Sequence, residues 1–347
     1  MPEFGTSTYL SSPVVAEAAL PGGGAAETPI FLSLHISEEF SPDYRERAER
    51  VCRQLREAGH RIIADVSQKT LAQFGEPDMV RLAKHLGLWA LRVDYGFTVE
   101  EIGALARRIP VAVNASTISP ESARTIARQG ELVMAMHNFY PRPETGLDDQ
   151  FFRARNQALR EAGLLVWAFI PGDSILRGPL RQGLPTLERH RGLPPSVCYA
   201  DLALGFRVDG IFVGDPGLSG RELERIRRFR ETGVLELPAV LDEGHHSLYG
   251  RVFTSRPDSP ARLVRFAESR EYSCAGAQVA PRGCAERRRG SVTLDNENYG
   301  RYSGELQLVR GDLPADSRVN VIGHIREEYL LMADLIPNGG RFALTPD

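Results

Sequence analysis

The chain has 347 residues with 42 basic and 45 acidic side chains, which gives a formal net charge of −3. This balance gives no global reason to expect a nucleic-acid partner, and no run of eighteen or more uninterrupted apolar residues suggests a membrane span. The four cysteines form no Cys-x-x-Cys pair and the N-terminus lacks a secretory signal, so reduced thiols and a cytoplasmic location are expected.

The first two thirds of the chain alternate strand patterns with helix patterns. Strands are expected at residues 3–9, 30–36, 61–66, 90–93, 110–114, 131–137, 164–170 and 210–213. Helices are expected at residues 13–20, 42–58, 78–86, 99–108, 120–129, 148–162, 196–204 and 220–232. Eight strand and helix units in series imply an α/β fold with a closed parallel barrel of the TIM type.

After residue 232 the alternation stops, and short strand patterns dominate the rest of the chain. A barrel domain is therefore placed at residues 1–233 and a smaller β-rich domain at residues 234–347. Strands are expected at residues 250–254, 291–294, 305–308, 319–322 and 341–344, with helices at 260–268 and 329–335. A small, mostly antiparallel barrel or sandwich fits this pattern.

Polar residues fall at or just beyond the C-terminal ends of the predicted strands. They are Ser7, His35, Asp65, Asp94, Asn114, His137 and Asp215. This is the face on which barrel enzymes place their chemistry. The alternative for each single residue is that it caps the following helix.

The stretch from His137 to Leu147 reads His-Asn-Phe-Tyr-Pro-Arg-Pro-Glu-Thr-Gly-Leu and connects a predicted strand to a predicted helix. Pro141 and Pro143 restrict the backbone around them. The stiffened loop would therefore hold a set of functional side chains in limited directions, as a preorganised site requires. These side chains are His137, Asn138, Arg142 and Glu144. The alternative is a rigid loop that only leads into the helix.

The motifs of nucleotide phosphate loops, zinc protease helices, nucleophile elbows and dinucleotide turns are absent, so neither a metal nor a cofactor is expected. Carboxylates and arginines remain as the groups that could carry out chemistry. Glycoside hydrolysis needs two acids, and the candidates are Asp65, Asp94, Glu144, Asp173, Glu188 and Asp215. Guanidinium groups bind phosphate or carboxylate in a bidentate way, so an anionic substrate could be neutralised by Arg142, Arg177, Arg301 and also His137.

Two long loops are candidate binding segments. The insert that begins at Gly172 and includes Arg177 and Glu188 is either a lid over the site or a solvent-exposed excursion. The run 295–305 in the second domain is either a plain hairpin loop or a segment that reaches over the barrel mouth and completes the pocket.

Several stretches carry a resemblance to a known family. They are residues 4–9, 31–36, 113–117, 137–147, 177–180, 183–188, 214–216 and 299–305. Together they resemble the 6-phospho-N-acetylmuramidase family over nearly the whole chain. The resemblance implies a TIM-type barrel, a C-terminal cyclophilin-like β domain, and cytoplasmic hydrolysis of the β-1,4 bond between N-acetylmuramic acid 6-phosphate and N-acetylglucosamine in peptidoglycan recycling. Residues 11–28 depart from the family pattern, because they are short and glycine-rich where the family usually carries a full helix.

Residue roles are hypotheses from chemistry, because the resemblance itself assigns none. Glu144 is the expected general acid, and Asp65 or Asp94 the second carboxylate, unless the acetamido oxygen of the substrate attacks and one of them only orients it. Asn114, His137, Asn138 and Arg142 are expected to bind sugar and lactyl groups, and Arg177 and Arg301 the 6-phosphate. Further substrate contacts are expected from His35, Asp173, Glu188, Asp215, Asn296 and Glu305.

Two other classes of function stay open at this point. A barrel of this kind could bind a sugar phosphate without cleaving it, and a cyclophilin-like domain could suggest prolyl isomerisation, although fold does not carry function. The expected partner is a small phosphorylated amino-sugar disaccharide, with neither nucleic acid nor membrane, and a homodimer is left open.

Overall fold

The structure is a computed structural model that describes residues 1–11, 28–34, 36, 41–93, 95–274 and 278–346. The chain forms two compact units, Met1–Leu223 and Glu224–Asp347. This division lies inside helix α8 (Gly220–Thr232), whereas the boundary expected from the sequence lies directly after it. Within the described residues, no helix combines the length and the apolar composition that a membrane crossing requires.

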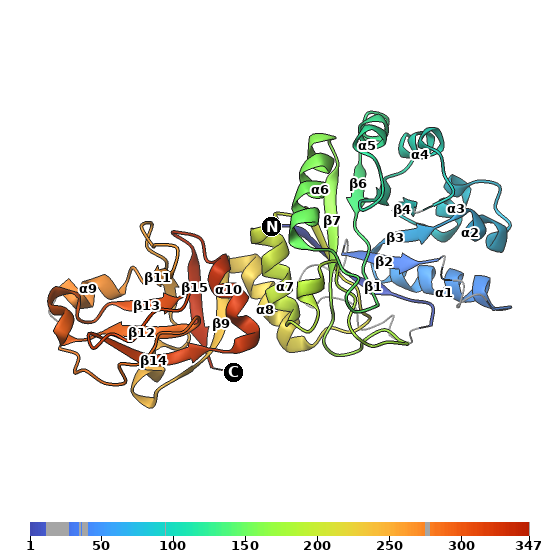
Figure 1. The fold of residues 1–347 in the computed structure, drawn as a ribbon. Helices are drawn as coiled ribbons and strands as arrows, with labels where there is room; N and C mark the ends of the chain where they lie inside the picture. The colour runs from blue at the N-terminus through green and yellow to red at the C-terminus, as the bar shows by residue number, and fades with distance from the viewer. Residues whose placement is uncertain (12–27, 35, 37–40, 94, 275–277, 347) are drawn as a thin grey trace. The chain divides into compact units, whose positions relative to one another are not determined.

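The first unit is a closed barrel of eight parallel strands, as the sequence predicts (Figure 1). Each strand pairs in parallel with the next, and β8 pairs with β1. The strands are β1 (Glu3–Thr8), β2 (Pro29–Ser33), β3 (Arg61–Val66), β4 (Ala90–Val93), β5 (Val111–Asn114), β6 (Val133–Met136), β7 (Leu165–Ile170) and β8 (Gly210–Val213). Because all strands run in the same direction, their C-terminal ends meet at one mouth of the barrel.

Helices follow the strands on the outside of the barrel (Figure 1). They are α1 (Tyr44–Glu57), α2 (Gln68–Phe74), α3 (Met79–Leu86), α4 (Val99–Ala106), α5 (Pro120–Ala127), α6 (Asp149–Glu161), α7 (Pro195–Ala200) and α8. Local signals set their starts: Ser119 caps α5 ahead of Pro120, and Asp148 caps α6. Helix α2 was not expected from the sequence, and the helix expected at 13–20 lies outside the described residues.

The barrel interior holds an apolar cluster with residues from seven of the strands, β2 to β8. It comprises Phe31, Ile63, Ala90, Ala112, Met134, Met136, Trp167, Phe169 and Phe212. Side chains alternate along a strand, so the residue two positions further on points to the same side. On β2 to β5 those residues are Ser33, Asp65, Arg92 and Asn114, all of them buried. An apolar floor therefore lies under a polar layer at the C-terminal mouth.

The second unit is a single seven-stranded sheet in the order β10-β15-β9-β14-β12-β13-β11. Its strands are β9 (Val234–Leu241), β10 (Val252–Thr254), β11 (Leu263–Arg265), β12 (Ser291–Asp295), β13 (Leu306–Val309), β14 (Val319–Ile325) and β15 (Arg341–Thr345). All neighbours pair antiparallel except β15 and β9, which are parallel. The β-rich second domain is thus confirmed, while its likeness to cyclophilin stays a prediction.

The helix expected at residues 260–268 is wrong. Leu263–Arg265 is strand β11, which pairs antiparallel with β13. Val264 is fully buried between two half-buried neighbours, which is the alternation of a strand at the edge of a sheet. Tertiary pairing with β13 therefore overrides the local helix pattern. The expected helix at 329–335 is present as α10 (Leu330–Leu335), and α9 (Ser269–Cys274) follows β11.

Candidate active site at the barrel mouth

A buried ion pair lies at the centre of the polar layer. Asp65 on β3 and Arg92 on β4 are register partners, and Arg92 Nη1 donates to Asp65 Oδ1 at 2.7 Å. Arg92 Nη2 also donates to the side-chain oxygen of Asn138. The side chains of Arg92 and Asp65 are 3% and 6% exposed, so each compensates the other for the loss of water. The structure thus brings together Asp65 and Asn138, two expected site residues, through an arginine that the sequence analysis missed.

Arg92 carried a usable signal. It is the one charged residue in the otherwise apolar pattern of the strand Ala90–Val93, and charged residues are seldom fully buried unless they are paired. Asp94 on the same segment, and His35 after β2, lie outside the described residues.

A second polar group surrounds His137, directly after β6. Its ring is fully buried, and its Nε2–H donates to Asn156 Oδ1 at 2.7 Å. That tautomer leaves Nδ1 to accept from the Ser116 hydroxyl, which is 3.3 Å away. The Ser116 hydroxyl oxygen also lies 3.3 Å from the Tyr140 hydroxyl. His137 thus links the loop after β5 to its own loop.

Burial lowers the pKa of His137 to about 4. The hydrogen bond to Asn156 opposes this shift, and the nearby guanidinium of Arg155 reinforces it. The ring is therefore neutral at pH 7, and it serves the site through hydrogen bonds rather than positive charge. Asn114, a further expected site residue, accepts the backbone N–H of Ser116 at 3.0 Å and so holds the same loop.

Glu188 fixes the loop that carries Glu144. Its two carboxylate oxygens accept the backbone N–H groups of Glu144 at 2.9 Å and Gly146 at 2.8 Å. Arg191 donates to the same carboxylate at 2.6 and 2.8 Å. Hydrogen bonding from Arg191, together with these backbone donors, lowers the pKa of Glu188 to about 2. Glu188 therefore stays charged and acts on the loop conformation.

Glu144 has a left-handed backbone with φ of 69°, a conformation that residues other than glycine rarely adopt. Its side chain and that of Arg142 are exposed. Within the described residues neither makes a side-chain hydrogen bond or ion pair, so the structure does not join Glu144 to Asp65.

Asp215, just beyond β8, organises the long loop after β7. It is 1% exposed and accepts three backbone N–H groups, from Gly172, Arg177 and Leu184, each at 2.9 Å. Burial raises the pKa of this carboxyl, and the three donors oppose the shift. Asp173 binds the same loop to the start of α8, because it accepts the N–H and the hydroxyl of Ser219 at 2.7 and 2.6 Å. Both expected site residues therefore anchor the loop.

Arg177 presents a stacked guanidinium on this loop. The group lies 4.3 Å from the ring centroid of Tyr9 and 5.9 Å from that of Phe139. Cation–π stacking uses the face of the guanidinium and leaves its N–H edge for a ligand. Within the described part of the chain that edge donates no hydrogen bond, which suits the expected contact with an anion.

Comparison with known proteins gives the family. The N-terminal model of the 6-phospho-N-acetylmuramidases matches residues 23–228, and their C-terminal model matches residues 235–345. The chain belongs to the 6-phospho-N-acetylmuramidase family. Members are named for glycoside hydrolysis, so membership supports a glycosidase function and confirms the resemblance read from the sequence.

Two solved structures share the architecture over the whole chain. A conserved Enterococcus faecalis protein of unknown function is 33% identical, with a TM-score of 0.83, over 99% of this chain and 96% of its own. An uncharacterized B. cereus protein is 23% identical, with a TM-score of 0.79, over 99% of this chain and 100% of its own, which shows the fold alone. No match was found among the curated proteins.

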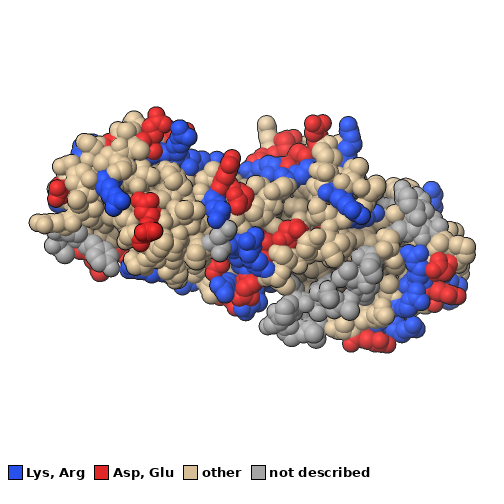
Figure 2. Space-filling model, turned by 90° about the horizontal axis from the view of Figure 1, so that it is seen from below, with Lys and Arg blue, Asp and Glu red and all other residues tan. Residues whose placement is uncertain are grey.

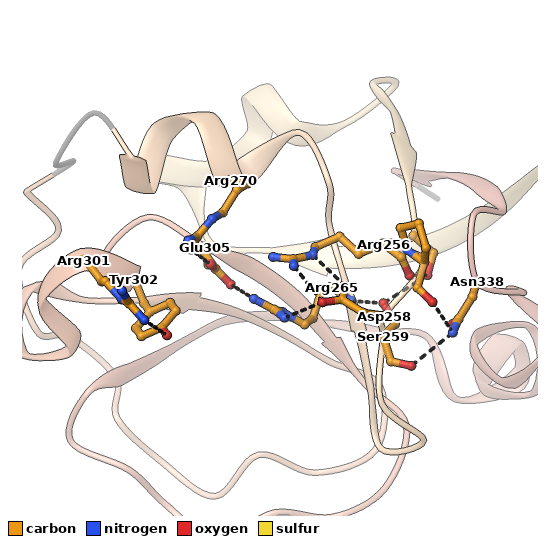
Figure 3. A network of polar contacts seen from close by, with 11 residues as sticks. Arg256, Asp258, Ser259, Arg265, Arg270, Arg301, Tyr302, Glu305 and Asn338 are labelled. Carbon is orange, nitrogen blue, oxygen red and sulfur yellow. Dashed lines mark hydrogen bonds and ion pairs between the residues drawn. The ribbon is translucent and has the colours of Figure 1, made fainter.

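The three expected site residues of the second unit lie in the part that the C-terminal family model covers. Glu305 is 3% exposed and binds both Arg265 and Arg270 (Figure 3). Arg301 stacks on Tyr302 and donates to its hydroxyl at 2.8 Å (Figure 3). Asn296 is buried and donates to Asn320 Oδ1 at 2.9 Å. Glu305 and Asn296 thus stabilise their own unit, and the completion of the barrel pocket by this segment stays a prediction.

The run 295–305 also begins with an acid that is not among the expected site residues. Asp295, at the end of β12, is 3% exposed, and burial together with the nearby Glu305 charge raises its pKa to about 7. A carboxyl with this pKa exchanges its proton near neutral pH.

On the face shown in Figure 2, basic and acidic side chains lie in small mixed groups among uncharged residues. A stripe of one sign, which nucleic-acid binding would favour, is not visible on the part of this face that the structure describes.

Proposed function

We propose that the protein hydrolyses the β-1,4 bond between N-acetylmuramic acid 6-phosphate and N-acetylglucosamine, as one step of cytoplasmic peptidoglycan recycling. The observation that carries this proposal is the match of both family models over nearly the whole chain. The polar layer at the barrel mouth adds support, because that is where barrel enzymes bind and convert their substrates.

Asp65 supplies a charged carboxylate at the base of the mouth. The ion pair with Arg92 favours its anionic form, which suits a nucleophile or a group that orients the acetamido N–H of the substrate. It does not suit a proton donor. Asn138 accepts from Arg92 through its side-chain oxygen. Its side-chain NH2 group can then donate to the sugar beside the Asp65 carboxylate.

Glu144 supplies the proton for the leaving oxygen. Its loop is held in place by Glu188 and by two prolines, and this arrangement fixes the backbone from which the carboxyl extends. A saccharide that covers the loop would remove water from Glu144 and bring the leaving oxygen within reach of its carboxyl.

A purified sample incubated with the phosphorylated disaccharide tests this function. Release of N-acetylglucosamine and N-acetylmuramic acid 6-phosphate in equal amounts supports it, and the unphosphorylated disaccharide is the matched control substrate. If neither monosaccharide forms while the chain remains folded, the hydrolase proposal is wrong.

A non-catalytic sugar-phosphate-binding protein is the second candidate. The observation that favours it is the exposed side chain of Glu144, which has no contact with Asp65 among the described residues. This candidate expects the disaccharide to raise the melting temperature without any release of product.

A further inference from the structure

A cleft of about 590 Å³ opens beside the barrel mouth. It lies between the loop after β7 and the first residues of α7 and α8, all within the first unit. Pro171 and Gly172, which follow β7 directly, form part of its wall, so the cleft is at the same end of the barrel as Asp65 and Arg92. Its volume is in the range of small-ligand sites, about 300–1,000 Å³.

The charged residues of the cleft wall are three arginines and two acids, Arg181, Arg191, Arg221, Asp173 and Glu222. Both acids already accept hydrogen bonds from other residues of the protein. Asp173 accepts two hydrogen bonds from Ser219, and Glu222, which is 1% exposed, accepts the backbone N–H of Ser196 at 2.9 Å. The acids therefore bind the walls of the cleft together.

Arg191 is also occupied. It donates to the Glu188 carboxylate and to the carbonyl oxygens of Gln182 and Gly183, the latter two at 3.0 and 3.1 Å. Its guanidinium thus supports the loop, and two cationic groups of the wall remain.

Those two are Arg181 and Arg221, and both are exposed. Arg221 forms a long ion pair with Glu222, whose carboxylate oxygen lies 4.0 Å from Arg221 Nε, too far for a hydrogen bond. Arg181 is placed by a left-handed backbone with φ of 53° and by its N–H, which donates to the carbonyl of Arg177 at 3.2 Å. Within the described residues neither guanidinium donates a hydrogen bond, although each presents a fork that matches a phosphate.

We propose that this cleft is the phosphate subsite of the protein, with Arg181 and Arg221 as the two groups that bind the phosphate. The assignment of a sugar phosphate as the natural ligand rests on the proposed function. The loop after strand 7 and a helix start belong to the recurrent anion site of this barrel fold. The cleft combines the loop after β7 and the start of α8 with two exposed guanidinium groups that donate no hydrogen bond within the described residues. The subsite thus differs from the sequence-based expectation of Arg177 and Arg301.

Binding of inorganic phosphate to the full chain tests the subsite without any turnover. Titration calorimetry compares the wild type with Arg181→Gln, Arg221→Gln and the double variant. Each single substitution is expected to weaken phosphate binding about tenfold or more, which is about 1.4 kcal/mol or more. Arg124→Gln is the matched control, because Arg124 is an exposed arginine of α5 outside the cleft wall. A wild type that binds no phosphate, or variants that bind it as the wild type does, would overturn the proposal.

Turnover separates the subsite from the proposed function. If the subsite is correct, the double variant loses the preference for the phosphorylated over the unphosphorylated disaccharide in kcat/KM. Hydrolysis with an unchanged preference would refute the subsite and leave the hydrolase function standing. Phosphate binding that depends on both arginines, without any hydrolysis, would refute the function and leave the subsite standing.

Discussion

The guanidinium of Arg92 lies 2.7 Å from the carboxylate of Asp65 on the neighbouring strand, and both side chains are buried in the barrel mouth. Removal of Arg92 takes away the cation that lies against this buried carboxylate. Arg92→Met is therefore expected to lower the free energy of unfolding by about 3–5 kcal/mol. Denaturant unfolding of the variant measures this loss.

The double variant Asp65→Leu, Arg92→Met checks the reason for that loss. Since it removes both charges, it is expected to recover much of the stability that the single substitution costs. If the double variant loses a further amount of unfolding free energy, similar to the loss caused by Arg92→Met alone, the ion pair does not explain the destabilisation.

The pKa of His137 predicts how stability depends on pH. The unfolded chain binds a proton at this residue below about pH 6.5, whereas the folded chain binds it only below about pH 4. The contribution of His137 to the free energy of unfolding is therefore fully present above pH 6.5. It falls by on the order of 3 kcal/mol as the pH falls from 6.5 to 4. Unfolding free energies of the wild type and His137→Gln across this range measure the difference. A decline of equal size in both proteins would contradict the prediction.

Glu188 predicts a separate loss of stability at lower pH. Its folded pKa of about 2 lies below the ordinary value of 4.5, so its contribution is present above pH 4.5 and is lost as the pH falls towards 2. Glu188→Gln is expected to lower the melting temperature at pH 7 and to flatten its decline between pH 4.5 and 2. An equally steep decline in the variant would show that Glu188 does not anchor the loop of Glu144.

Local patterns in the sequence predicted most of the barrel. Strand β3 (Arg61–Val66) appears with the expected bounds, because an apolar run of strand length follows a helix pattern that ends ahead of Gly59. The expected polar strand ends also lie at the mouth for Ser7, Asp65, Asn114, His137 and Asp215, the members of that set that the structure describes. Alternation of strands and helices is a local property, so a single sequence contains it.

Contacts between distant segments could not be predicted in the same way. Glu188 accepts from a backbone 44 residues away, and no spacing rule connects it to Glu144. Arg92 could be read as buried, but only the register of β4 against β3 places it beside Asp65. Similarly, β11 exists because β13 lies beside it, which the segment 260–268 does not reveal.

Glu144→Gln tests the catalytic assignment most directly. The side chain is exposed and forms no side-chain hydrogen bond or ion pair within the described residues, so its loss is expected to leave the melting temperature unchanged. Loss of a general acid lowers kcat by about 10²–10⁴-fold. Glu131→Gln, at an exposed glutamate ahead of β6, is the matched control and should keep wild-type turnover. Near-normal hydrolysis of the phosphorylated disaccharide by Glu144→Gln would show that Glu144 is not the general acid. Asp65 would then be the next carboxylate to substitute.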